Sequence, residues 1–394
     1  MKILYMYNDP GIPLFGRKGC STHARETCQA LSACGHEVQV VCSNLQGDDQ
    51  APVDFKVHQV QPPTSRKLGF DLRHIWLDRN MRRRLKDLMR QWRPDALYER
   101  YSLYGRAGHW AARHYQLPHL LEVNAFLTRE QERRIKLPWL ARRSERGIIR
   151  RATGVIVVSE SLREEVHSLG VPLESIHKMP MAVDLQKFHP SVDGTDIRKK
   201  LNLEDRFVIG YVGTLTAWHG ISLLYNLTFK LLHAEAPKFV ILVVGGEQRR
   251  VEDHRRKVKA ASYEDQMRFI GSVPHQEVPA YIRAMDLTLV PDTTYWSSPA
   301  KLFEYQASGK PVLAPDYPSI REMVEHGREG YLFEPNNTDQ IAACILELMQ
   351  QPERMARMAD ASRRRVQREH SWTRNAEIIV NLFEELRAGR AKPV

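Results

Sequence analysis

Short apolar runs alternate with stretches of helical periodicity along the chain, and the alternation pauses near residue 188 before it restarts. In the first half, the runs that predict strands are Ile3–Tyr7, Val38–Cys42, Phe55–Val60, Ala96–Glu99, His119–Val123, Gly154–Val158 and Ser175–Met179. In the second half they are Phe207–Val212, Lys238–Val244, Met267–Ile270, Leu287–Val290, Val312–Ala314 and Gly330–Phe333. Strands that alternate with helices predict doubly wound, largely parallel sheets, so the fold class is α/β with two such sheets.

A turn-rich segment, Phe188–Thr195, separates the two patterns. A chain of 394 residues also exceeds what one hydrophobic core usually organises. We therefore predict an N-terminal domain over residues 1–187 and a C-terminal domain over 188–370. Residues 371–394 form a last segment, in which the helix Asn375–Arg387 is expected to cross back onto the first domain.

The composition favours a folded protein in a reducing compartment. Hydrophobic residues make up 42% of the chain, and the five cysteines form no Cys-x-x-Cys pair, which fits reduced thiols better than disulfides or zinc. The chain enters its first strand directly, and no apolar run approaches the roughly 20 residues that span a bilayer. We expect a cytoplasmic protein.

The net charge of +11 belongs almost wholly to the N-terminal half, because residues 1–190 contain 30 Lys and Arg against 20 Asp and Glu. The basic residues gather in Arg79–Arg93 and Arg129–Arg151, and interleaved apolar residues predict that both segments are helical. A solvated helix face and a peripheral contact with an anionic membrane surface both account for such clusters. No helix-turn-helix, zinc-finger or stacking pattern accompanies the charge, which disfavours nucleic acid as a partner.

The stretch Ser297–Pro311, SSPAKLFEYQASGKP, carries most of the candidate chemistry. It follows a predicted strand, so its helix should begin at the C-terminal edge of a parallel sheet, where open α/β sheets bind ligands. Free backbone N–H groups at the helix start and the charge of Lys301 suit a phosphate, and Glu304 can accept hydrogen bonds from sugar hydroxyls. An ordinary capped helix is the alternative interpretation.

A glycine-containing loop follows the first strand. Gly11, Gly16 and Gly19 are spaced by five and three residues, which does not match Gly-x-Gly-x-x-Gly and counts against a dehydrogenase. The loop could still bring backbone close to a pyrophosphate. His23, near the start of the next helix, either hydrogen-bonds substrate hydroxyls or has a structural role.

An ordered series of motifs resembles the retaining glycosyltransferases of family 4. Besides Ser297–Pro311, the series comprises Lys2–Tyr5, Gly19–His23, Gly35–Val38, Tyr98–Arg100, Leu121–Asn124, Val155–Glu160, Pro180–Pro190, Gly210–Leu215, Val243–Gly246, Phe269–Val273 and Ser371–Trp372. The resemblance implies the GT-B fold, in which two Rossmann-like doubly wound domains face each other across a cleft. It also implies transfer of a hexose from a UDP- or GDP-linked donor to a lipid-linked or polysaccharide acceptor, as in exopolysaccharide or lipopolysaccharide synthesis, without a cofactor.

The resemblance also implies roles for individual residues. The donor-binding set is Gly19, Gly213, Thr214, Val273, Ser297, Ser298, Pro299, Ala300, Lys301, Leu302 and Glu304. The acceptor-binding set is Arg100, Glu122 and Asn124, and the candidate catalytic groups are Lys301, Glu122, His23 and His219. Because no Asp-x-Asp motif occurs, fixed positive groups are expected to replace a metal ion at the leaving phosphate. For Glu122, a buried structural pair with a nearby arginine is the alternative.

The sequence departs from the family pattern in three ways. Trp296 occupies the place of a first glutamate, and Pro180–Asp184 reads Pro-Met-Ala-Val-Asp instead of Pro-Asn-Gly-Val-Asp. Thr214 and His219 stand where Arg and Lys usually hold the pyrophosphate, so positive charge is missing there unless His219 is protonated. These departures leave the identity of the donor open. Three functions are alternatives to a glycosyltransferase: a nucleotide-sugar epimerase, a phosphorylase of the same fold, and a non-catalytic nucleotide-sugar-binding module.

Overall fold

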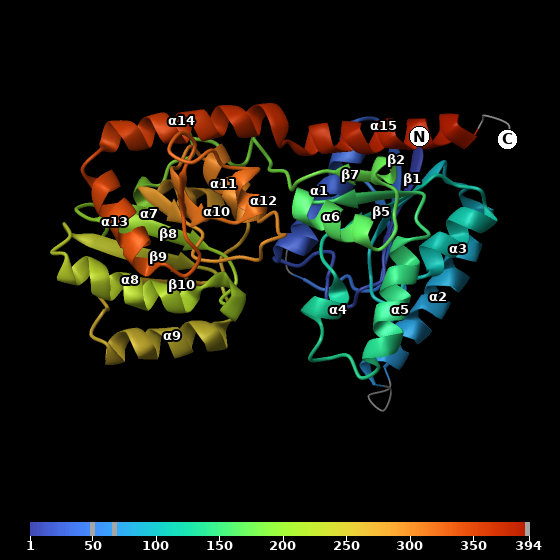
Figure 1. Ribbon diagram of the computed structural model, residues 1–394, viewed down its shortest axis with the longest axis horizontal. Helices are drawn as coiled ribbons and strands as arrows, with labels where there is room; N and C mark the ends of the chain where they lie inside the picture. The colour runs from blue at the N-terminus through green and yellow to red at the C-terminus, as the bar shows by residue number, and fades with distance from the viewer. Residues whose placement is uncertain (48–51, 65–68, 391–394) are drawn as a thin grey trace. The chain divides into compact units, whose positions relative to one another are not determined.

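The computed structural model describes residues 1–47, 52–64 and 69–390, which form two compact units (Figure 1). Unit 1 contains Met1–Pro180 and the segment that begins at Trp372, and unit 2 contains Met181–Ser371. The chain therefore leaves unit 1 once and returns to it once.

The described part of unit 1 contains a seven-stranded parallel sheet in the order β3-β2-β1-β4-β5-β6-β7. Its strands are β1 (Lys2–Tyr7), β2 (Glu37–Cys42), β3 (Lys56–Gln59), β4 (Ala96–Arg100), β5 (His119–Val123), β6 (Gly154–Val157) and β7 (Ile176–Lys178). Its α-helices are α1 (Gly19–Ala33), α2 (Phe70–Gln91), α3 (Ala107–His114), α4 (Leu127–Glu130), α5 (Pro138–Ile149), α6 (Glu160–Ser168) and α15 (Trp372–Arg390).

Unit 2 contains a six-stranded parallel sheet in the order β10-β9-β8-β11-β12-β13 among its described residues. Its strands are β8 (Phe207–Val212), β9 (Phe239–Val244), β10 (Met267–Gly271), β11 (Leu287–Leu289), β12 (Val312–Pro315) and β13 (Tyr331–Phe333). Its α-helices are α7 (Thr195–Lys200), α8 (Ile221–His233), α9 (Gln248–Ala260), α10 (Val278–Arg283), α11 (Ala300–Ala307), α12 (Pro318–Arg321), α13 (Thr338–Met349) and α14 (Pro352–Glu369).

Both faces of the unit 2 sheet are covered at β9, which explains why this strand is apolar throughout. In β9, Ile241 and Val243 pack in one cluster with Leu224 of α8, and Val240 and Leu242 belong to a second cluster. Successive side chains of a strand point to opposite faces, so a strand covered on both sides shows no polar alternation. All thirteen predicted strands are present, each within one residue of its expected ends.

The units divide earlier than the turn-rich composition suggested. Met181 and Phe188 are buried, and Val183 forms an isolated bridge with Ser371, so the segment after Pro180 already belongs to unit 2. The last helix, α15, begins at Trp372 and contacts α1 of unit 1.

The segment Arg129–Arg151 is not one helix, contrary to the sequence-based prediction. It contains the end of α4, a turn and then α5, which begins at Pro138. Proline is well suited to the first turn of a helix but cannot continue one, so the chain starts a new helix there. Among the residues described, no helix has both the length and the apolar character needed to cross a membrane.

Candidate functional site

Helix α11 begins near the C-terminal edge of the unit 2 sheet, one loop after β11, as the sequence predicted. The amide of Ser297 donates to the carbonyl of Thr294, and that of Leu302 donates to the carbonyl of Pro299, which itself has no N–H. Among the described residues, the amides of Ser298, Ala300 and Lys301 have no acceptor. These are the unsatisfied donors that make a helix start attractive to anions.

The Lys301 ammonium lies against Tyr211. Its Nζ is 3.1 Å from Tyr211 Oη, 3.4 Å from His219 Nδ1 and 4.5 Å from the centre of the Tyr211 ring. Tyr211 in turn donates to the carbonyl of Thr214 at 2.8 Å. A Cβ at Gly213 would lie 2.9 Å from Lys301 Nζ and 2.7 Å from Tyr211 Oη, so this close approach requires glycine.

The protonation states of this cluster follow from burial. Burial lowers the pKa of Lys301 from 10.5 to about 7, and Glu304 opposes the shift. Burial and the neighbouring Lys301 lower the pKa of His219 to about 3. His219 is therefore neutral near pH 7, and the idea that its protonation supplies the missing positive charge is wrong.

Glu304 lies one helical turn after Lys301, with its side chain 16% exposed. Burial raises its pKa to about 7, while Lys301 and Lys187 act in the opposite direction. His275 Nε2 is 4.0 Å from Glu304 Oε1, and Lys187 Nζ is 2.6 Å from His275 Nδ1. Two lysines, Lys301 and Lys187, therefore lower the pKa of Glu304, whereas the sequence analysis predicted only Lys301 at this site.

Sequence reasoning missed Tyr211, Lys187 and His275. Tyr211 and Lys187 stand inside recognised motifs, and His275 follows one of them, so the available signal was proximity to those motifs: Tyr211 lies between two glycines at the end of β8, and His275 follows Val273 by two residues. Val273 itself is partly buried and packs against the cluster that contains Val240 and Leu242.

Other predicted donor residues have structural contacts. Ser298 Oγ accepts the amide hydrogen of Met181 at 3.0 Å, and Ser297 Oγ lies 2.6 Å from Thr293 Oγ1. Leu302 is fully buried with its amide already bonded, and it presents no free polar group. Trp296 is buried too, so its ring offers no replacement for the absent carboxylate.

A second cluster surrounds Glu122 in unit 1. His23 Nε2 lies 2.7 Å from Glu122 Oε1, Arg100 Nη1 lies 3.3 Å from the same oxygen, and the Asn124 amide donates to it. Burial alone would raise the pKa of Glu122, but His23, Arg100 and Asn124 together lower it to about 2. Glu122 is a buried anion with an arginine partner, which is the geometry of the structural alternative.

The surroundings of this cluster belong to unit 1. The His23 ring is 5.4 Å from that of Trp372, at the start of α15. Gly19 is the first residue of α1, and a Cβ there would meet open space, so packing does not require glycine at this position.

No set of three His, Cys, Asp or Glu side chains arranged to hold a metal ion is found in the described ranges.

Two family models match the two units. Residues 18–182 match the "Glycosyl transferase 4-like domain", and residues 193–365 match "Glycosyl transferases group 1". The D-inositol 3-phosphate glycosyltransferase 1 of Catenulispora acidiphila is 26% identical over 321 residues, covering 76% of this chain and 74% of that protein.

A second curated relative and a solved structure are also similar to this chain. The alpha-D-kanosaminyltransferase of Streptomyces kanamyceticus is 21% identical over 250 residues, 63% of this chain; the chain spans 64% of that protein's length. The solved structure of Anabaena HepE in complex with UDP has a TM-score of 0.76 at 19% identity, covering 98% of this chain and all of that one.

Two Rossmann-like units, each matched by its own glycosyltransferase model, define the GT-B glycosyltransferase class. Within that class, the chain belongs to the family 4 type, as the order of its motifs indicated.

Proposed function

We propose that this protein is a retaining, metal-independent hexosyltransferase that uses a UDP- or GDP-linked sugar. The observation that carries the proposal is the position of Lys301: a half-buried amine next to the unsatisfied amides of the α11 start, with Gly213 leaving room beside it. The UDP bound to the HepE structure supports a nucleotide as the ligand of this fold.

The chemistry follows from the charges that develop in the reaction. Cleavage between an anomeric carbon and a nucleoside diphosphate makes the sugar more positive and the departing phosphate more negative. Lys301 and the amides of Ser298 and Ala300 would stabilise the departing phosphate, because preorganised donors act most strongly where charge develops. Glu304 would accept hydrogen bonds from the ribose hydroxyls, with Lys187 and His275 holding its carboxylate in place.

The acceptor is assigned to unit 1. Arg100, Glu122 and Asn124 lie at and just beyond the carboxyl ends of β4 and β5, the edge where α/β sheets bind ligands. In this proposal His23 orients Glu122, and the acceptor hydroxyl attacks from the face that the phosphate leaves, passing its proton to that phosphate. No side-chain nucleophile is then needed.

A donor panel tests the proposal. Thermal shift with UDP, GDP, ADP and their sugars identifies the nucleotide, since a ligand at 100 times its Kd stabilises a fold by roughly 2.7 kcal/mol. Nucleotide release with the selected donor and candidate acceptors should then persist in EDTA, and NMR of the product should show retained anomeric configuration.

The alternatives give different outcomes. An epimerase would release nucleotide and an altered sugar without an acceptor, and a phosphorylase would carry a lysine-bound pyridoxal group visible by its absorbance. A binding module would bind donor and release no nucleotide with any acceptor. An inverted product or activity lost in EDTA would contradict the retaining, metal-independent part of the proposal.

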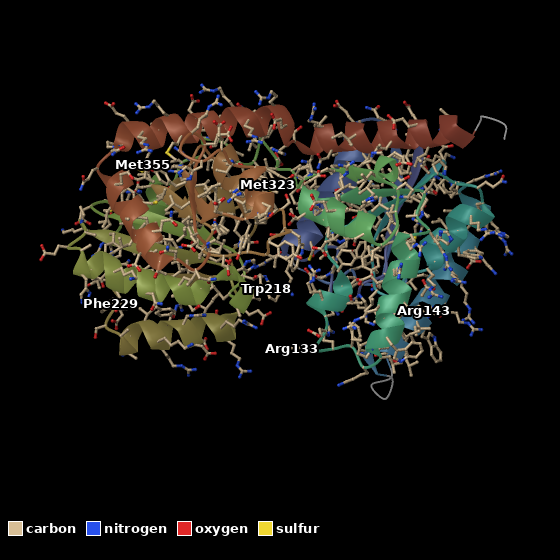
Figure 2. The ribbon with its side chains drawn as sticks, in the orientation of Figure 1. Arg133, Arg143, Trp218, Phe229, Met323 and Met355 are labelled. Carbon is tan, nitrogen blue, oxygen red and sulfur yellow. The ribbon has the colours of Figure 1, made fainter. Side chains whose placement is uncertain are left out.

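We also propose a peripheral contact with the inner face of a membrane, to present a lipid-linked acceptor. Large apolar side chains are exposed at the starts of α2 and α5, including Trp76 at 53% and Trp139 at 67%. These helix starts are joined by the Lys136 amide, which donates to Asp71 of α2 at 2.8 Å. Basic residues flank them; Figure 2 marks Arg133 before α5 and Arg143 on it. Aromatic rings with nearby cations suit the surface of an anionic bilayer.

A further inference from the structure

An open cavity of about 630 Å³ lies at the surface of unit 1, bordered by α2, α3 and the end of α5. Its lining is Arg82, Arg106, His109, Trp110, Arg113, His114, Gly147, Ile148 and Arg151, with no acidic side chain among them. The volume is typical of a small-molecule site. Neither the proposed donor site nor the Glu122 cluster contributes a residue to it.

The arginines of this cavity are largely uncompensated. Only Arg82 has a nearby carboxylate, with its Nε 3.4 Å from Asp78 Oδ2. Asp78 also accepts the amide hydrogens of Arg106 and Ala107 at 2.7 Å each, and burial raises its pKa to about 6. Over the described part of the chain, no carboxylate lies within ion-pair distance of the Arg106, Arg113 or Arg151 guanidinium.

The positive charge of the arginines affects a histidine in the wall of the cavity. Burial lowers the pKa of His109, and His119, Arg151 and Arg113 lower it further. Trp110 lies against His114 in a stacked arrangement, with ring centres 5.3 Å apart, and Lys86 Nζ is 5.4 Å from the Trp110 ring centre. Arg106, Arg113 and Arg151 are exposed to solvent, so water screens much of the repulsion among them, and an anion bound between them would be attracted by all three charges.

We propose that this cavity binds a diphosphate group. The planar guanidinium fork donates two parallel hydrogen bonds to phosphate oxygens, and several forks around one concavity match several phosphoryl oxygens. A single phosphate would leave part of this charge uncompensated, and a nucleic-acid duplex is too wide to enter a cavity of this volume. The diphosphate can come from a soluble anion or from the head of a diphosphate-linked lipid.

Calorimetric titration with inorganic pyrophosphate tests the proposal, with Lys301→Ala present in every protein to suppress binding at the donor site. Replacing Arg106, Arg113 and Arg151 by Gln should weaken binding at least about tenfold, because charge-assisted hydrogen bonds are lost. The matched control replaces Arg142, Arg143 and Arg146, which are exposed on α5. It removes the same charge and should bind like its parent.

Arg113→Gln alone should weaken binding in the same direction, and it serves as the test if the triple variant does not fold. A short soluble prenyl diphosphate separates the two sources: tighter binding than pyrophosphate identifies a lipid head group, and equal binding identifies a soluble anion. Equal affinities of the cavity variants and the control, or no pyrophosphate binding by the parent, would overturn the proposal.

Discussion

Replacing Lys301 by methionine is expected to stabilise unit 2 while removing its activity. Burial lowers the pKa of Lys301 from 10.5 to about 7. A shift of this size, which already includes the attraction of Glu304, corresponds to roughly 5 kcal/mol for the protonated amine, and the partial solvent exposure of Lys301 reduces that cost. We therefore expect Lys301→Met to raise the free energy of unfolding at pH 7 by about 2 to 3 kcal/mol.

The gain has a defined pH dependence. The pKa of Lys301 is lower in the folded than in the unfolded state, so the buried ammonium costs most below pH 7 and progressively less above it. Near pH 10.5 the lysine is neutral in the folded state and losing its charge in the unfolded state, and the cost disappears above that pH. Calorimetric melting of both proteins across this range should show the difference in Tm shrinking as pH rises.

The activity of Lys301→Met should fall, although its stability should rise. Loss of one preorganised group that stabilises developing charge lowers kcat by about 10²- to 10³-fold. The fall in kcat should be at least as large as the rise in donor KM, because such a group acts mainly in the transition state. Nucleotide release under saturating and limiting donor separates the two parameters.

Lys310→Met is the matched control. Lys310 follows the opposite end of α11, and burial, with Arg283, lowers its pKa to about 7 as well. It should gain stability by a similar mechanism and keep its turnover. Normal turnover in Lys301→Met would refute the catalytic part of the reasoning, and a stability gain in Lys310→Met alone would refute the electrostatic part.

Three further substitutions test the donor site and the membrane contact. Above about pH 8, where Glu304 is ionised, Glu304→Gln keeps the side-chain shape but removes its charge, so calorimetry should show donor affinity weakened by roughly 1.5 to 3 kcal/mol, and unchanged affinity would exclude Glu304 from the site. His219→Gln should leave the pH profile of turnover unchanged above about pH 5, because His219 is neutral there; a lost limb of the profile would show that His219 is charged. The double variant Trp76→Ser with Trp139→Ser should bind anionic vesicles more weakly than the wild type at low salt. Binding of the wild type should largely disappear at high salt, because the Debye length falls from about 10 Å at 0.1 M to 3 Å at 1 M. Equal binding by the variant and the wild type would place the membrane contact elsewhere.

The strands and α11 could be predicted because neighbouring residues in the sequence specify each of them. Most strands are short apolar runs between turn residues, and Pro299 and Gly309 bracket α11. Register, layer order and burial of both sheet faces then follow from parallel pairing.

The rest depends on contacts between distant positions. Lys301 and Tyr211 are separated by ninety residues, and Lys187 and His275 by eighty-eight. The neutral state of His219 results from burial beside Lys301, which its place in the chain does not reveal. The bridge between Val183 and Ser371 is equally remote, and this is why turn-rich composition alone placed the boundary between units too late.

The return of the chain to unit 1 has a consequence for synthesis. Unit 2 is one continuous segment, Met181–Ser371, whereas unit 1 receives α15 only after that segment has been made. The whole of unit 2 is therefore synthesised while α1, whose His23 ring lies beside Trp372 in the complete protein, still lacks the helix that packs against it. The first unit to begin is the last to finish, and until then the face of α1 that α15 covers stays exposed, as the surfaces of partly folded chains that favour aggregation do.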